Sequence, residues 1–184
     1  MADYVHSSRS VVRVYRSRNG SPPINKYEES TAASTAVIQF GQVVMFDPAT
    51  SSNNFRVSRC STANGQSPIL PANVVGVSAQ GSTSDGSTTG LGVGEGRMLS
   101  IWEATPSVEF LFPTKVVIAS TLVNTGLELS WDSTLGIHHV TANSTAGDQV
   151  VRITGVVPGT VGDTGGFLVG RFFSSVVAPA ISGV

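Results

Sequence analysis

The chain is short of the residues that usually carry catalysis and metal binding. Its 184 residues include three histidines and a single cysteine, Cys60. One cysteine excludes an intrachain disulfide and a cysteine-cluster metal site. The G-x-S-x-G motif of a nucleophile elbow is absent as well. We therefore expect a protein that is not an enzyme and that needs no metal or cofactor.

Charge is also scarce and unevenly placed. Charged residues make up 12% of the chain and the net charge is −1, whereas about 25% is usual. Lysine occurs only at Lys26 and Lys115, but the first 18 residues hold four arginines. With no overall positive charge, nothing draws the chain as a whole to nucleic acid or to an anionic membrane, and we expect neither as a partner.

Long apolar runs are missing too. No stretch approaches the roughly 20 apolar residues of a membrane-spanning helix. The first 20 residues contain no apolar segment of the kind that directs secretion. We expect synthesis in a cytoplasm.

What the chain does have is strand periodicity. Apolar and polar residues alternate in 98–102, 107–112 and 127–131, which is typical of half-buried strands. The runs 43–46, 115–120, 149–157 and 166–173 are apolar at successive positions and suit strands covered on both faces. Turn residues separate nearly all of these segments. We predict an all-β fold, a small β-barrel or sandwich of a β-tulip-like kind.

Composition divides the chain into an N-terminal arm, residues 1–30, and a β-barrel domain, residues 31–184, with a flexible loop at 81–96. Pro22-Pro23 favours an extended connection in the arm. Glycines recur at every second position from Gly90 to Gly96, but no helix pattern and no G-K-[ST] follow them. Phosphate loops need both glycines and a following helix N-terminus. The segment is better interpreted as a connection between two strands.

Four residues of the chain could take part in chemistry: His138, His139, Cys60 and Asp132. His138 and His139 are neighbours in a predicted strand, so their rings point to opposite faces and do not share one metal. We expect one ring at the surface and one partly buried. Cys60 is either a nucleophile or an ordinary thiol at a strand end, and we favour the thiol. Asp132 could join a histidine and a serine only if the fold gathered them.

The N-terminal arm carries the clearest functional signal. In 11–18, Val12 and Val14 alternate onto one face with Arg16 and Arg18, and Arg13 lies on the other. Such a segment can add a strand to another chain's sheet edge while its arginines pair with carboxylates. The alternative is a disordered tail.

Four short motifs follow one another along residues 38–174. They comprise Gly41, Val43, Val44 and Asp47; Val74, Val75, Gly76 and Val77; Gly126, Leu129 and Asp132; and Leu168, Val169, Arg171 and Phe172. Their order resembles that of the head decoration, or cement, proteins of tailed bacteriophages.

The resemblance implies a structural virion protein that binds the outer surface of a phage capsid, with the major capsid protein as partner and a homo-trimer as the assembled form. We assign the capsid-binding role to the arm residues Arg9, Val12, Arg13, Val14, Tyr15, Arg16 and Arg18. Another virion subunit (tail, fibre or baseplate) and a carbohydrate-binding surface module are the alternatives.

Overall fold

The computed structural model describes residues 11–29, 38–46, 56–60, 73–80, 98–142, 148–163 and 165–177. Arg9 and the predicted loop 81–96 lie outside these ranges. The strands are β1 (Arg13–Ser17), β2 (Ile24–Glu29), β3 (Val43–Phe46), β4 (Arg56–Arg59), β5 (Val74–Ser78), β6 (Met98–Glu103), β7 (Val108–Pro113), β8 (Gly126–Asp132), β9 (Ile137–Thr141), β10 (Val151–Val156) and β11 (Phe167–Phe172). A 3₁₀ turn, η2 (Ser120–Leu122), joins β7 to β8.

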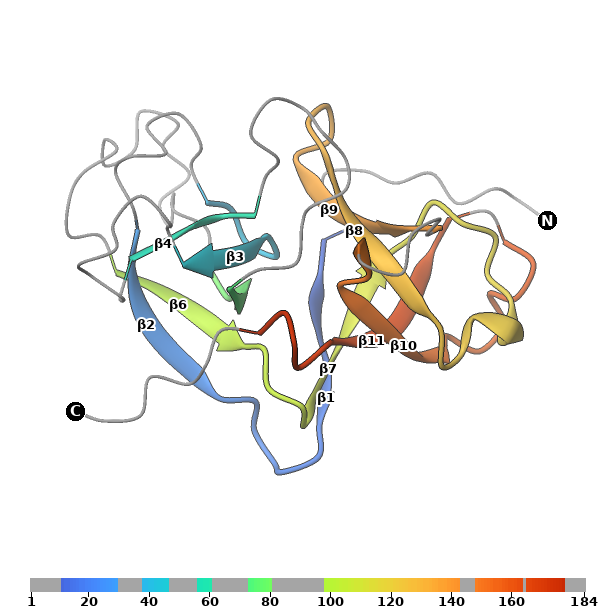
Figure 1. Ribbon diagram of the computed structural model, residues 1–184, viewed down its shortest axis with the longest axis horizontal. Coiled ribbons are helices and arrows are strands. Elements are labelled where there is room, and N and C mark those ends of the chain that lie inside the picture. The colour runs from blue at the N-terminus through green and yellow to red at the C-terminus, as the bar shows by residue number, and fades with distance from the viewer. Residues whose placement is uncertain are drawn as a thin grey trace.

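These strands form two β units side by side (Figure 1). One is a closed barrel with the strand order β2-β4-β3-β5-β6, and the other is a six-stranded sheet with the order β1-β7-β11-β10-β8-β9. The prediction of an all-β fold with a small barrel is confirmed.

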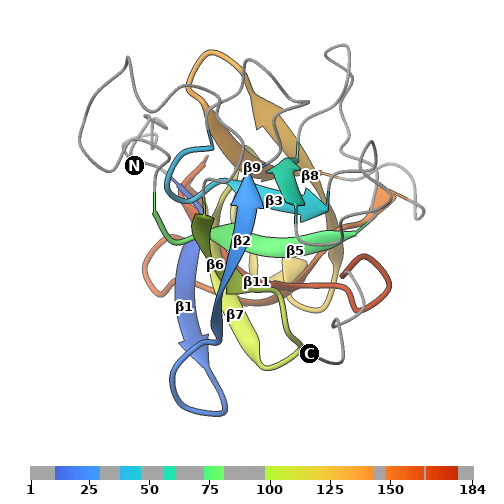
Figure 2. The same cartoon turned by 90° about the vertical axis from the view of Figure 1, so that its left-hand side faces the viewer.

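The barrel closes because β2 pairs with strands on both of its sides. It runs antiparallel to β6 and parallel to β4, and Figure 2 shows it in front of the barrel. The barrel interior is a small apolar cluster, with Tyr27 and Phe46 packed at its margin. Its buried members are Ile38, Val44, Val57, Val75, Leu99 and Ile101.

The second and larger core lies between the barrel and the six-stranded sheet. In β3, Val44 faces the barrel interior, whereas its neighbour Val43 belongs to the larger core. This is the two-sided burial that the apolar run 43–46 predicts. From the sheet, Phe110, Phe112 and Phe172 meet in this core with ring centroids 5.3–6.1 Å apart, a spacing typical of aromatic clusters.

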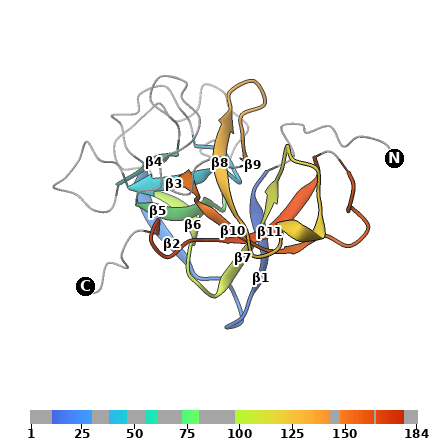
Figure 3. The same ribbon diagram turned by 45° about the vertical axis from the view of Figure 1, so that its right-hand side comes forward.

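The two ends of the six-stranded sheet differ. At one end, β9 curls back to the chain that leaves β7, where Thr114 and Val140 form a parallel bridge. At the other end, β1 pairs with β7 alone among the described residues. Figure 3 shows the β8–β9 hairpin beside β3 and β4, and β1 running along β7. Within the described ranges, β1 is thus the last strand at this end of the sheet.

The prediction of an arm separate from the body is wrong for residues 11–29. β1 pairs with β7, and β2 completes the barrel. The side chain of Val12 is completely buried, and burial of apolar area holds this segment on the body. Pro22-Pro23 lies between β1 and β2, so it marks a turn between two strands rather than the junction between an arm and a domain.

The prediction of a strand at 115–120 is also wrong. Thr114 Oγ1 accepts a hydrogen bond from the N–H of Val116 (3.1 Å), which turns the chain directly after β7. Ile118 then exchanges backbone hydrogen bonds with the turn at Gly162 and Asp163. The run is apolar because Ile118 is buried, while Val117 is 55% exposed.

The predicted connection at 81–96 joins neighbouring strands, because β5 and β6 pair antiparallel. A strand follows the glycines where a phosphate loop would need a helix. The flanking strands agree with the interpretation of this segment as a connection.

The close packing of the barrel wall can be tested at Gly76 in β5. A Cβ atom there would lie 2.0 Å from the carbonyl oxygen of Trp102, on the neighbouring strand. We expect Gly76→Ala to lower the free energy of unfolding by about 1–3 kcal/mol, because overpacking forces the backbone to move. Urea denaturation followed by tryptophan fluorescence measures this change.

The matched control is Gly155→Ala in β10, where a Cβ atom would meet nothing closer than Val169 Cβ at 3.7 Å. We expect this variant to be as stable as the parent chain or slightly more stable, since alanine restricts the unfolded chain. Equal losses in both variants would contradict the close contact between β5 and β6.

Candidate functional site

The residues that the sequence singles out for binding are divided between the core and the surface of the sheet. Val12 is buried and Val14 packs on the larger core. Arg13 and Arg16 lie exposed on β1, and Tyr15 is 48% exposed between them. The valines therefore fix the strand, and the polar members of the set remain accessible.

A register shift at Tyr15 changes the predicted distribution of side chains. Simple alternation places Arg16 on the face of Val12 and Val14, which is the buried face. In the structure Val14 pairs with Phe110 and Arg16 pairs with Glu109, so that Tyr15 is an extra residue in β1. The shift moves Arg16 to the outer face with Arg13, because a guanidinium group is costly to bury among phenylalanines.

Glu109 is the ionic partner of these arginines. Its carboxylate is 1% exposed and accepts a charge-assisted hydrogen bond from Arg16 Nε, while Arg18 Nη2 lies 3.8 Å from Oε1. Arg16 and Arg18 thus each have a carboxylate of their own chain within ion-pair distance, while their pairing with carboxylates of another chain stays a prediction. The residues are 93 apart in sequence, so local pattern does not reveal the pair.

The pKa of Glu109 depends on opposing effects of burial and of the neighbouring cations. Burial raises the pKa of the carboxyl group, but the hydrogen bond from Arg16, the neighbouring Thr154 hydroxyl and the charges of Arg16 and Arg18 lower it. The lowering effects are larger in sum, so the pKa of Glu109 lies below its usual value. The group is a carboxylate at neutral pH, held by cations on the outer face of the sheet.

Two further arginines extend this ionic group across the sheet. Arg152 of β10 lies directly opposite Arg171 of β11. In the β11–β7 register Gly170 pairs with Phe110, so Arg171 and Glu109 are the next residues along these two strands. We call this surface the arginine face: Arg13, Arg16, Arg18, Arg152 and Arg171 around Glu109.

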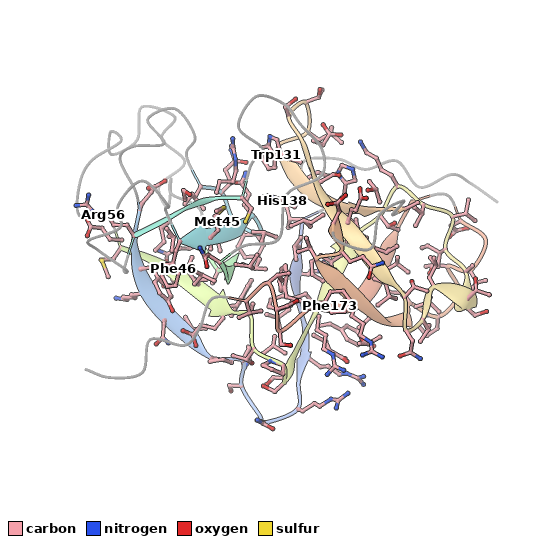
Figure 4. The ribbon with its side chains drawn as sticks, in the orientation of Figure 1. Met45, Phe46, Arg56, Trp131, His138 and Phe173 are labelled. Atoms are coloured by element: carbon pink, nitrogen blue, oxygen red, sulfur yellow. The ribbon has the colours of Figure 1, made fainter. Side chains whose placement is uncertain are left out.

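The strands of this face are poor in negative charge. β1, β7, β10 and β11 contain one carboxylate between them, that of Glu109. In Figure 4, side chains with nitrogen ends gather along the lower side of these strands. The face is therefore strongly positive although the whole chain has a net charge of −1.

The aromatic rings on this face are paired with its own cations. The guanidinium carbon of Arg13 lies 5.2 Å from the ring centroid of Phe167, and that of Arg16 lies 5.7 Å from the ring of Tyr15. Both distances are within the range of a cation–π contact. These contacts hold the long side chains close to the sheet.

His138 forms a polar link between the two β units. Its Nδ1 accepts a hydrogen bond from the N–H of Val43 (3.1 Å), and its Nε2 donates to the carbonyl oxygen of Cys60 (2.5 Å). This pairing fixes the neutral tautomer with the proton on Nε2. Figure 4 shows His138 and Trp131 on the side of the β8–β9 hairpin that faces β3.

The environment of His138 strongly disfavours protonation. Burial is the largest effect, with the nearby charges of Arg59 and His139 adding to it, and together they lower the pKa of His138 to about 3. The hydrogen bond to Cys60 acts in the opposite direction and is outweighed. With both nitrogens bonded and no proton to exchange near neutral pH, His138 is a structural link.

The two histidines lie on opposite faces, as predicted: His138 pairs with Trp131 and His139 with Ser130. The expectation that one of them is at the surface is wrong, because both are buried. His138 is 0% exposed and His139 is 4% exposed. Both rings are buried because both faces of the β8–β9 hairpin are covered by other parts of the chain.

Cys60 agrees with the interpretation as a thiol at a strand end. It follows β4, is fully buried, and burial raises the pKa of its thiol to about 12. Next to it, Arg59 lies over the ring of Trp131 with 4.1 Å between the guanidinium carbon and the ring centroid. Burial lowers the pKa of Arg59, and the stacked indole compensates for part of its lost hydration.

Asp132 serves the turn between β8 and β9. Its carboxylate forms a salt bridge with Lys115 (2.8 Å) and accepts backbone hydrogen bonds from Thr134 and Leu135, each 3.0 Å long. The hydrogen bond from Lys115 is the largest of the effects that lower the pKa of Asp132. Asp132 pairs with Ile137 in the hairpin, so this carboxylate stabilises the turn.

Within the described ranges, no three histidine, cysteine, aspartate or glutamate side chains are grouped closely enough to hold a metal ion. The same part of the chain contains no helix that is long and apolar enough to cross a membrane.

Sequence reasoning missed Glu109, Arg152 and Arg171 as members of the site. The signal available for Glu109 was its polar position in the alternating segment 107–112. Arg152 and Arg171 each interrupt an apolar strand, which marks them as outward-facing charges. What brings the three together is strand order, and the sequence does not contain that order in readable form.

Comparison of the chain with family models, with curated proteins and with solved structures gives no match.

The buried carboxylate yields a prediction about stability. We expect Glu109→Gln to lower the free energy of unfolding at pH 7 by about 1–3 kcal/mol, because charge-assisted hydrogen bonds to a buried group are lost. Since the folded-state pKa of Glu109 is lowered, its contribution is present above its unfolded pKa and disappears as pH falls through the folded value. The variant and the parent chain should therefore converge in acid.

Glu28→Gln is the matched control, because Glu28 pairs with Arg56 at 3.0 Å with about a fifth of each side chain exposed. We expect a smaller loss there. Chemical denaturation at several pH values measures both variants, and an equal effect of the two would contradict a special role for Glu109.

The His138 link yields a prediction about acid sensitivity. Its folded pKa, about 3, is below the ordinary value of 6.5, so below pH 6.5 the unfolded chain takes up a proton that the folded chain refuses. Stability from this group is complete above pH 6.5 and falls by at most about 1.4 kcal/mol per pH unit toward pH 3. We expect His138→Gln to remove this slope.

The informative interval is pH 4.5–6.5, because carboxylates with lowered pKa values titrate below it. The other histidines are present in both chains, so the difference between the two slopes isolates His138. Identical slopes for the parent chain and the variant would show that His138 is not held neutral in the fold.

Proposed function

We propose that this chain is a capsid decoration protein of a tailed bacteriophage, a structural protein that binds the outer surface of the shell and stabilises it. The observation that supports this most directly is the edge of β1, which pairs with β7 alone among the described residues and carries exposed arginines. The partner is the major capsid protein, and the assembled form is a homo-trimer.

The edge of β1 supplies a means of attachment. An unpaired strand edge presents backbone N–H and C=O groups to which another chain can add a strand. Because β1 is already held in extended form by its pairing with β7, little further ordering is required on binding.

The exposed apolar side chains support a role in broad contacts. Tyr15, Ile24 and Phe40 are 48%, 52% and 43% exposed. Phe40 contacts Trp102 edge to face at 5.7 Å, and Ile24 pairs with Trp102 across β2 and β6. Single exposed apolar residues are ordinary, but a contiguous group suits an interface. A protein that binds only the assembled shell stabilises the shell by mass action.

Occupancy on purified expanded capsids of the encoding phage tests the proposal. We expect the parent chain to saturate the shell and Arg13→Glu to bind at least about tenfold more weakly, because it reverses charge beside the β1 edge. Arg13 forms no ion pair with Glu109, so the ionic group around Glu109 stays intact. Light scattering of the same preparation tests for a trimer of the 19.1 kDa chain.

Lys26→Glu on β2 is the matched control, with the same charge change at an exposed position of the barrel. Deletion of residues 1–10 measures the part of the predicted arm that lies outside the described residues, without removing β1. Failure of the parent chain to bind any form of the shell would exclude a decoration role, and electron microscopy of labelled particles would then show whether the protein belongs to the tail.

A further inference from the structure

The arginine face has more positive charge than its own structure uses. Arg16 and Arg18 are paired with Glu109, and Arg13 lies over Phe167. No carboxylate in the described part of the chain forms an ion pair with Arg152 or Arg171. Among the described residues, the one hydrogen bond given for their side chains runs from Arg171 Nη1 to the carbonyl oxygen of Pro106 and is 3.3 Å long.

The position of Arg152 and Arg171 is unfavourable without a ligand. The two residues are direct partners across β10 and β11, and like charges at such positions repel each other. Arg152 is exposed, and Arg171 is partly so. A bound anion between them would remove the repulsion and supply the acceptors that two guanidinium groups prefer.

We propose that the arginine face binds a segment rich in aspartate or glutamate, with Arg152 and Arg171 as the residues that hold its carboxylates. The inference deepens the proposed function, because it names the chemistry of the shell surface that the protein would recognise. The edge of β1 and the arginine face belong to one sheet, but β7 separates β1 from β11, and β11 separates β7 from β10. The acidic segment therefore lies across the outer face of these strands to reach Arg152 and Arg171.

A carboxylate fits the face better than a nucleic acid phosphate. The face already holds one carboxylate, Glu109, between Arg16 and Arg18. Single-stranded nucleic acid needs open aromatic platforms on which bases stack. Here the ring of Phe167 is covered by Arg13, and Tyr15 is next to Arg16. The aromatic surfaces of this face are thus engaged by its own cations.

The test uses the purified full chain and a short fluorescent all-glutamate peptide. Fluorescence anisotropy at low salt should show saturable binding that weakens as salt is added, because exposed ionic contacts are screened. We expect Arg152→Gln combined with Arg171→Gln to weaken binding about tenfold or more. Lys26→Gln, which removes a cation from the barrel instead, should bind as the parent chain does.

Thermal unfolding followed by circular dichroism establishes that the double variant is folded, and the single exposed substitution Arg152→Gln replaces it where it is not. A neutral glycine–serine peptide and an oligothymidylate of equal charge are the comparison ligands. Absence of peptide binding at low salt, equal weakening by Lys26→Gln, or tighter binding of the oligothymidylate would each overturn the inference.

The capsid measurement separates this inference from the proposed function. In one outcome, peptide binding needs Arg152 and Arg171 but the protein does not occupy the shell. This result would support the acidic ligand and exclude the capsid as partner. Occupancy on the shell that does not change in the double variant would support the decoration role and overturn the acidic site.

Discussion

The packing of the barrel wall on the inner face of the six-stranded sheet is the constraint on which the rest of the structure depends. Strand β3 sends one valine into each of the two cores, so neither unit is complete alone. Phe110, Phe112 and Phe172 fill the shared core from the sheet, and His138 satisfies two backbone groups of the barrel where the units meet. Because the inner face of the sheet packs against the barrel, the charged residues of the sheet are confined to its outer face.

Alternation of apolar and polar residues predicts three strands correctly, although β7 and β8 are buried on both faces. The alternation in 98–102, 107–112 and 127–131 corresponds to β6, β7 and β8. Sequence periodicity fails at 115–120, because a hydroxyl of Thr114 and backbone bonds to a distant turn bend an apolar run that could equally have been a strand. It fails again at Tyr15, where one extra residue in β1 transfers Arg16 to the other face.

The candidate site was predictable only in its N-terminal part. Charge clustering in the first 18 residues drew attention to Arg13, Arg16 and Arg18, but their partner Glu109 and the companions Arg152 and Arg171 come from three other strands. Their proximity follows from the strand order, which depends on long-range packing. The burial of both His138 and His139 has the same origin, because residues outside β8 and β9 cover the second face of the hairpin.

The position of β1 and β2 in the strand order has a consequence for biosynthesis. These strands leave the ribosome before their partners, because β2 pairs with β6 and β1 pairs with β7, far along the chain. β1 and β2 must therefore wait with open edges until β6 and β7 have been made. Non-local pairing of this kind slows folding and exposes the nascent chain to aggregation. The exposed arginines on β1 act here as gatekeepers, because their mutual repulsion opposes edge-to-edge association of unfinished chains.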